Sequence, residues 1–174
     1  MEYKMIVIVF GLPGSGKSFF ASRLAEKLEG KYINSDELRL RMFPVRSYSE
    51  EEKEKVYEEM VKEMEKAMTK GESIVLDATF YKEGIRKMFI ESAKVYQQAI
   101  HFIEVQADEA IIRERLSKKR EYSEADYSTY LKVKASFEPL KQDHLILQST
   151  QDNIDEMLKK ALDHIREKQW KLNR

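Results

Sequence analysis

The chain alternates between short apolar runs and longer stretches in which apolar residues recur at helical spacing. Residues 5–10, Met-Ile-Val-Ile-Val-Phe, are apolar without interruption, which is typical of a strand buried on both faces of a parallel sheet. Further runs at 32–34, 74–76, 100–105 and 144–147 predict four more strands. The pattern therefore predicts a sheet of five strands.

The segments between these strands carry apolar residues three and four positions apart, as in helices with one buried face. The predicted helices cover 17–28, 37–42, 83–96, 108–120 and 124–137, with a long helix between Ser49 and Gly71 and a closing helix around 154–165. Ser49 and Glu52 form a capping-box pattern at the start of the long helix. Strands that alternate with helices predict an α/β fold with helices on both faces of the sheet. No repeat or linker interrupts the chain, so we expect one domain over 1–174, with a helical lid over about 108–138.

The first strand is followed by the sequence Gly-Leu-Pro-Gly-Ser-Gly-Lys-Ser at 11–18, which matches the P-loop pattern G-x-x-x-x-G-K-[ST] between a strand and a helix. Glycines let backbone N–H groups turn toward phosphate oxygens, and the helix N-terminus adds partial positive charge. Lys17 is expected to act in catalysis by reaching the β- and γ-phosphates, and Ser18 to bind Mg²⁺. We predict that ATP or GTP is bound by Gly11, Pro13, Gly14, Ser15, Gly16, Lys17, Ser18 and Phe19.

Motifs of other P-loop classes do not occur. No Asn is followed by Lys, as in the N-K-x-D motif of G domains, and L-S-G-G-Q of transporter ATPases is missing. The pattern favours a small phosphotransferase.

Acidic and basic residues follow the second and third strands. In open α/β sheets, ligands bind beyond the carboxyl ends of the strands. Asp36 suits the role of a base that takes the proton of an acceptor hydroxyl, and Arg39 lies three residues on, where it could hold an acceptor phosphate. Asp77 is expected to support Mg²⁺, directly or through water, or to orient the acceptor. The alternative is that Ser35 or Asp36 only caps the helix, and that Asp77 caps a strand end.

Two more groups complete the predicted site. Thr79 and Arg86 are placed on the acceptor side, although Arg86 alone could equally be a solvated surface residue. The basic run at 113–120 is expected to close over the γ-phosphate, with Arg115 and Arg120 as catalytic and nucleotide-binding residues and Lys119 as a further nucleotide contact. The alternative for this run is a solvated helix face.

Composition narrows the functional classes. The formal net charge is zero, which argues against a protein that binds nucleic acid nonspecifically through an overall positive charge. Any nucleic-acid binding would require a local basic patch. There is no cysteine, and the three histidines show no metal-ligand spacing, so neither a disulfide scaffold nor a cysteine zinc site is expected. The chain shows no signal-peptide pattern and no long apolar run, so a soluble cytoplasmic protein without membrane contact is expected.

Four segments together resemble a known family: G-L-P-G-S-G-K-S at 11–18, N-S-D-E-L-R at 34–39, D-A-T at 77–79 and R-x-R-x-x-K-K-R at 113–120. The chain is similar to small P-loop kinases such as the kinase domain of polynucleotide 5′-hydroxyl kinase, with zeta-toxin-like kinases and seryl-tRNA kinase as relatives. The resemblance implies a sheet in the order 2-3-1-4-5 and transfer of a γ-phosphate to a hydroxyl.

The resemblance also implies roles for single residues. Asp36 would be the general base, Arg39 would contact the phosphate on the 3′ side of the acceptor, and Asp77 would support that site. Arg115 and Arg120 would contact the donor nucleotide. Phe80 departs from the Asn that some polynucleotide kinases carry after the Thr of this segment.

Three functions stay open. The first is a polynucleotide 5′-kinase acting on an RNA or DNA end, in which Phe80 or Tyr81 could stack on a terminal base. The second is a kinase of a nucleoside, sugar or related metabolite. The third is a nucleotide-binding regulator or slow ATPase without an acceptor. The sequence leaves the oligomeric state and the preferred nucleobase undetermined.

Overall fold

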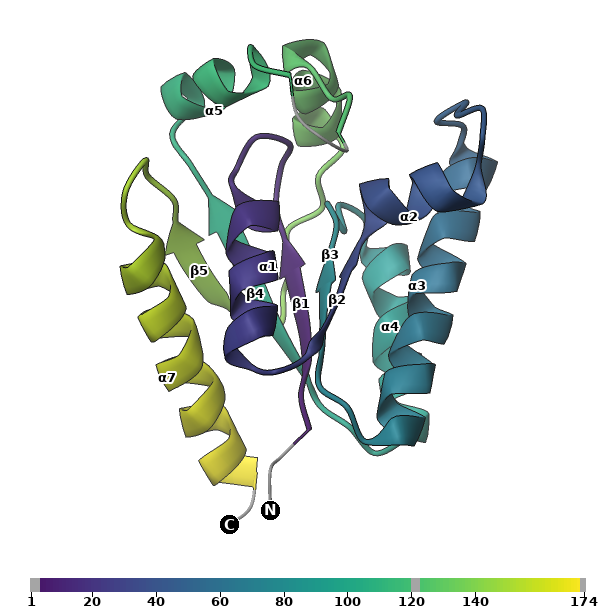
Figure 1. Cartoon of the computed structure of the whole chain (residues 1–174), viewed down its shortest axis with the longest axis vertical. Coiled ribbons are helices and arrows are strands. Elements are labelled where there is room, and N and C mark those ends of the chain that lie inside the picture. The colour runs from purple at the N-terminus through teal and green to yellow at the C-terminus, as the bar shows by residue number, and fades with distance from the viewer. Residues whose placement is uncertain (1–3, 120–122, 173–174) are drawn as a thin grey trace.

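The computed structural model describes residues 4–119 and 123–172. Its centre is a five-stranded parallel sheet in the order β2-β3-β1-β4-β5 (Figure 1). The strands are β1 (Ile6–Phe10), β2 (Lys31–Asn34), β3 (Ile74–Asp77), β4 (Ile100–Gln106) and β5 (Leu145–Gln148). The predicted strands and the order implied by the family resemblance are both confirmed.

Helices cover both faces of this sheet. They are α1 (Lys17–Lys27), α2 (Ser35–Met42), α3 (Glu50–Lys70), α4 (Glu83–Val95), α5 (Glu109–Leu116), α6 (Tyr127–Ala135) and α7 (Ile154–Leu172). Side chains of β1 alternate, so that Ile6, Ile8 and Phe10 join a core with α3 and α4. Val7 and Val9 join a second core with α1 and α7. Because both faces of β1 are covered, its sequence is apolar at every position.

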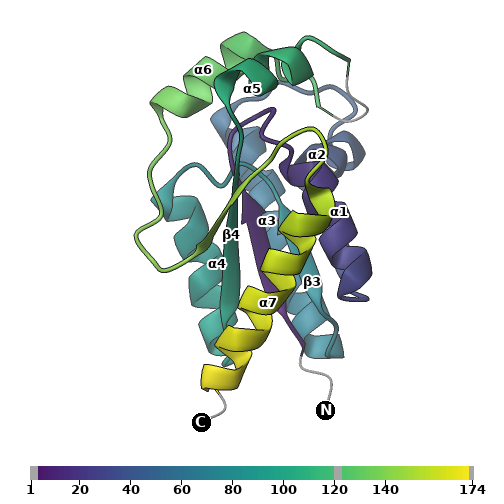
Figure 2. The same ribbon diagram turned by 90° about the vertical axis from the view of Figure 1, so that its left-hand side faces the viewer.

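The segment with α5 and α6 lies beyond the carboxyl ends of the strands, over the loop between β1 and α1 (Figures 1 and 2). Helix α5 ends at Leu116, four residues before the predicted end. Helix α6 is capped by Asp126, whose carboxylate accepts from the N–H of Thr129, so it begins at Tyr127 and not at residue 124 as predicted. No described helix combines the length and the apolar character that crossing a membrane requires.

The start of α3 is only half of the predicted capping box. Ser49 Oγ accepts from the N–H of Glu52 at 3.2 Å, as a helix N-cap should. The Glu52 carboxylate, however, does not return to Ser49; it accepts from the N–H of Ser47 at 2.6 Å. Helix α3 ends at Gly71, which has φ 66°.

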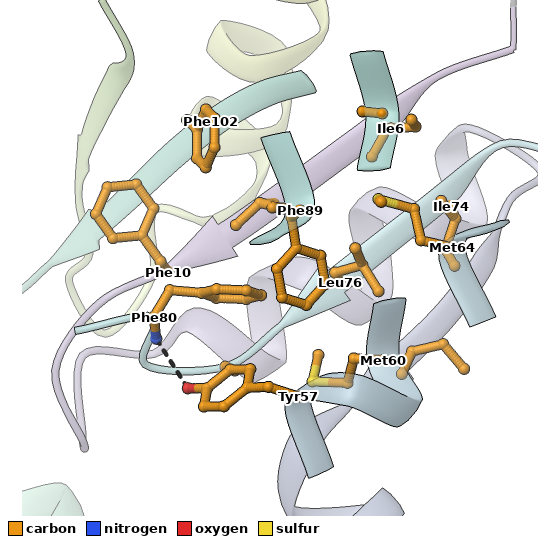
Figure 3. Packing of buried hydrophobic residues seen from close by; sticks show 14 of the residues in the cluster. Ile6, Phe10, Tyr57, Met60, Met64, Ile74, Leu76, Phe80, Phe89 and Phe102 are labelled. Carbon is orange, nitrogen blue, oxygen red and sulfur yellow. Dashed lines mark hydrogen bonds between the residues drawn. The ribbon is translucent and has the colours of Figure 1, made fainter. Parts of the chain in front are cut away.

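Phe80 belongs to the core. It follows β3 with φ 45°, is fully buried, and packs its ring 5.4 Å from that of Tyr57 and 5.1 Å from that of Phe89. The hydroxyl of Tyr57 accepts from the N–H of Phe80 at 3.2 Å (Figure 3). The idea that Phe80 stacks on a terminal base is therefore wrong, and Tyr81, at 8% exposure, offers little more surface.

Candidate active site

The loop 11–18 joins β1 to α1 in close contact with other elements. Gly11 has φ 151°, and a Cβ there would lie 2.3 Å from the carbonyl oxygen of Val105 at the end of β4. Gly16, the N-cap of α1, has φ 93°, and a Cβ there would lie 2.7 Å from Ser149 Oγ. Glycine allows both the backbone conformation and the close approach. The loop thus ends at the N-terminus of α1, where backbone N–H groups can receive an anion.

Arg115 of α5 fastens this loop to the segment after β5. Its Nη1 donates to the carbonyl oxygens of Gly14 at 3.3 Å and Ser15 at 3.0 Å. Its Nη2 donates to Ser149 Oγ at 3.1 Å and to the carbonyl oxygen of Thr150 at 2.8 Å. Partial burial lowers the pKa of Arg115 below its ordinary value, but a guanidinium stays charged. The structure thus brings Arg115 to the loop, in contact with its carbonyl groups.

A cavity of about 590 Å³ opens beside the loop. Its walls come from the loop, the start of α1, α5 and the start of α7, and include Lys17, Ser18, Phe19, Lys118, Gln151 and Met157. The size suits a small ligand. Phe19 is 54% exposed and lies under the guanidinium of Arg23 at 3.5 Å.

The remaining basic residues of the run lie farther along. Lys118 lines the cavity and pairs with Glu114 at 3.0 Å. Lys119 is exposed beyond the end of α5. Arg120 falls outside the described residues, so its predicted role stays a prediction.

Asn34, the last residue of β2, connects the loop to the acceptor side. Its Oδ1 accepts from the N–H groups of Asp36 at 3.0 Å and Glu37 at 2.9 Å. Its Nδ2 donates to Asp77 Oδ2 at 2.6 Å and to Ser18 Oγ at 3.3 Å. Since Asn34 is the N-cap of α2, the alternative that Ser35 or Asp36 serves as the cap is wrong. The Asp36 carboxylate lies on the first turn of α2 and is not its cap.

Asp77 is fully buried at the end of β3. Its Oδ2 also accepts from the hydroxyl of Tyr32 at 2.7 Å. Burial, and then the adjacent Asp77 carboxylate, raise the pKa of the Tyr32 phenol well above its usual range, so the phenol stays a donor. Oδ1 of Asp77 has no hydrogen-bond partner within 4–119 and 123–172.

These residues fit a magnesium ion that is shared with a bound nucleotide. Ser18 Oγ and the Asp77 carboxylate contact the same amide group, and Asp77 Oδ1 is a buried oxygen still able to accept. In the described chain no three His, Cys, Asp or Glu residues form a metal cluster. Phosphate oxygens and water would therefore have to supply the remaining ligands, which is how Mg²⁺ usually binds at phosphate sites.

On the acceptor side, Asp36 and Arg39 lie together as their spacing predicts, with Nη1 of Arg39 3.2 Å from Asp36 Oδ1. Arg39 Nε also lies 3.1 Å from Glu52 Oε1. Burial tends to raise the pKa of Glu52, but hydrogen bonds from Ser47 and the charge of Arg39 outweigh it, so this pKa is lowered. The site therefore holds a guanidinium between two carboxylates.

Thr79 and Arg86 have mainly internal contacts. Thr79 Oγ1 lies 3.3 Å from the hydroxyl of Tyr57. Arg86 is 2% exposed, so the alternative of a solvated surface residue is wrong. Its guanidinium donates to the carbonyl oxygens of Phe80 and Glu138, each at 2.7 Å, and ties the segment after β3 to the segment before β5.

Sequence reasoning missed Asn34, Tyr32 and Glu52. Asn34 pairs in register with Asp77, and Tyr32 shares its face because strand side chains alternate. With β2 placed next to β3 by the strand order, both side chains could have been predicted to lie near Asp77. Glu52 gave no such signal, since S-x-x-E also describes a purely local cap.

A protein-family model described as AAA domain matches residues 6–140 of the chain. A search of curated protein sequences found no match.

Solved structures, among them two kinases, are similar over nearly the whole chain. A gluconokinase from Sinorhizobium meliloti 1021 is 17% identical, with a TM-score of 0.75 and 99% of both chains covered. The Mycobacterium tuberculosis APS kinase CysC, in complex with AMPPNP and APS, is 16% identical, with a TM-score of 0.74, covering 94% of this chain and 98% of that one. Chaetomium thermophilum Kti12, in complex with ADP-AlF3, is 20% identical, with a TM-score of 0.71 and coverage of 93% and 97%. At these identities the likeness shows a common fold.

Proposed function

The chain belongs to the AAA domain family, and we propose that it is a phosphotransferase that moves the γ-phosphate of ATP or GTP to a hydroxyl acceptor beside Asp36. The observation that carries the proposal is the side chain of Asn34. It contacts Ser18 of the loop, Asp77, and the backbone of the helix turn that bears Asp36. One residue thus joins the donor side to the acceptor side.

Each residue has a defined task in this reaction. Backbone N–H groups of the loop and Lys17 hold the phosphates, which stabilises the charge that spreads over the γ-phosphoryl group. Asp36 orients the acceptor hydroxyl and takes its proton as the oxygen attacks the γ-phosphorus. The bond to the bridging oxygen breaks, and its electron pair leaves with the nucleoside diphosphate. Mg²⁺, held at Ser18 and Asp77, would supply charge neutralisation.

Two acceptor classes are consistent with this chemistry. The resemblance of the segment 34–39, which carries Asp36 and Arg39, to polynucleotide kinases favours a polynucleotide 5′-hydroxyl end. The folds shared with a gluconokinase and an APS kinase support a small molecule as the acceptor. A regulator without an acceptor is the third possibility, and it would lack any transfer activity.

The test mixes γ-labelled ATP or GTP with 5′-hydroxyl RNA, 5′-hydroxyl DNA, nucleosides and sugars. Lys17→Ala should abolish transfer. Asp36→Asn should slow transfer by about 10²-fold or more, the usual effect of losing a general base, and should leave nucleotide binding intact.

Glu37→Gln is the matched control, because Glu37 is the next carboxylate of the same helix turn and should be tolerated. Transfer by Asp36→Asn at the wild-type rate would show that another group is the base. Nucleotide binding without transfer to any acceptor would favour the regulator.

A further inference from the structure

The guanidinium of Arg39 is contacted at two of its nitrogens and on one face. Its side chain is 10% exposed, and two carboxylates flank it, Asp36 at 3.2 Å and Glu52 at 3.1 Å. The ring of Tyr48 lies over the guanidinium, 5.0 Å from its central carbon. A phosphate that approached the remaining edge of the guanidinium would lie beside both carboxylates and be repelled by their charge.

Glu52 is held firmly in this position. Its side chain is 4% exposed, and its second oxygen accepts from both the N–H and the hydroxyl of Ser47, at 2.6 and 2.8 Å. Two donors of Ser47 thus fix one oxygen of this carboxylate, and the other oxygen faces Arg39. The hydrogen bonds to one oxygen, and the charge of Arg39 beside the other, favour the ionised carboxylate and keep it next to Arg39.

Arg39 and two neighbouring cations, Arg46 and Lys53, are each paired with a carboxylate. One guanidinium stands between two carboxylates, which gives the group a net charge of about −1 when all three are ionised. Arg46 pairs with Glu124 at 2.6 Å, and Lys53 with Glu50 at 2.7 Å. A phosphate-bearing acceptor gains affinity from unpaired cations, and none of these three is unpaired.

We propose that Glu52 determines acceptor specificity by occupying Arg39, so that the site selects an uncharged small molecule bearing hydroxyl groups over an acceptor that carries a phosphate. Specificity of this kind comes from a repulsive element as much as from attraction. Arg39 then orients the Asp36 carboxylate. This inference rests on the proposed transfer reaction and names its substrate class.

The experiment compares matched acceptors that differ by one phosphate: a nucleoside with its 3′-monophosphate, and a sugar with a phosphate ester that keeps its other hydroxyls. The wild type should give the higher kcat/KM on the uncharged member. Glu52→Gln, which keeps the size of the side chain, should shift the ratio of kcat/KM values at least 10-fold toward the phosphate-bearing member.

Glu51→Gln is the control, because Glu51 is an exposed carboxylate of the same helix turn, paired with Lys55. It should leave the ratio unchanged. A wild type that prefers the phosphate-bearing member overturns the inference and leaves the kinase proposal standing.

A binding measurement does not depend on transfer. With the loop filled by Mg–AMPPNP, inorganic phosphate should raise the melting temperature of Glu52→Gln but not that of the wild type. The double variant Arg39→Met/Glu52→Gln should lose this shift. If the wild type transfers to no acceptor, the kinase proposal fails, and the phosphate measurement still decides whether Glu52 blocks Arg39. Equal responses of wild type and Glu52→Gln to phosphate would refute the role of Glu52.

Discussion

Replacing Gly11 with alanine is a direct test of how the loop is built. At φ 151° the backbone is in a region that side chains rarely adopt, which costs about 1–3 kcal/mol. The added Cβ would lie 2.3 Å from the carbonyl oxygen of Val105. That oxygen is part of β4, so relief requires movement of a central strand, and overpacking of this kind costs about 1–3 kcal/mol. We expect Gly11→Ala to lose about 2–6 kcal/mol of unfolding free energy.

Two other glycines provide matched comparisons. Gly84, in the first turn of α4, has open space around its Cβ position, so Gly84→Ala should stabilise the protein by up to about 1 kcal/mol. Gly16→Ala would meet Ser149 Oγ and Arg115 Nη1, which are side-chain ends and give way more easily than the backbone of β4. We expect this variant to lose about 1–2 kcal/mol of unfolding free energy, because alanine is strained in the left-handed backbone conformation. It should also bind nucleotide more weakly.

Urea unfolding followed by circular dichroism, with a shared m-value, measures all three variants. From the most to the least stable, the order should be Gly84→Ala, wild type, Gly16→Ala and Gly11→Ala. A Gly11→Ala protein within about 0.5 kcal/mol of wild type, the usual range for a surface change, would refute the reasoning. It would mean that the loop can move away from β4 at little cost.

Three further predictions follow from buried polar groups. Tyr57→Phe leaves the buried N–H of Phe80 without its acceptor and should cost about 1–3 kcal/mol in thermal unfolding; an unchanged melting temperature would contradict this. Burial, with smaller effects from charges on α7, lowers the pKa of His101 from 6.5 to about 4, so the native imidazole stays neutral while the unfolded one takes up a proton. The contribution of His101 to the unfolding free energy should therefore be fully present above pH 6.5 and fall by about 3 kcal/mol as the pH drops toward 4. His101→Gln should make the unfolding free energy less dependent on pH in this range. Asn34→Ala removes the amide that links Ser18 to Asp77 and should raise the apparent Kd of Mn²⁺ bound with AMPPNP by about 10-fold; an unchanged Kd would argue against the metal assignment.

The fold could be predicted well because its signals are local. The apolar run of β1 and the glycines of the loop each carry their own reason to adopt one structure, and the described strands lie close to the expected ranges. The order of the strands came from the family resemblance, since pairing between distant segments leaves no mark in either one. Boundaries such as the end of α5 at Leu116 were less accurate, because helix ends depend on contacts beyond the helix.

The candidate site could be predicted only in part. Asp36, Arg39, Asp77 and Ser18 are brought together at one edge of the sheet by their positions after the strands. The partners of these residues could not be read from the sequence. Glu52 sits in a local capping pattern, yet its carboxylate contacts Ser47 and, on another helix, Arg39; the pattern at 49–52 contains neither partner.

Phe80 shows a different limit. Its position directly after the acidic strand end suggested a place in the acceptor site. The positive φ at this residue turns the side chain into the core, and only tertiary packing could reveal that turn, since positive φ is uncommon outside glycine.

The contact of Arg115 with the loop has a consequence for the entropy of ligand binding. In a trans peptide unit the C=O and N–H groups point in opposite directions. Because Arg115 holds the carbonyl of Ser15, the N–H of Gly16, in the same peptide unit, is turned away from the arginine. The loop therefore has part of its anion-binding geometry before any nucleotide arrives, and less freedom has to be lost on binding. Helix α5 thus preorganises the loop through Arg115, so that part of the binding conformation is present before a nucleotide binds.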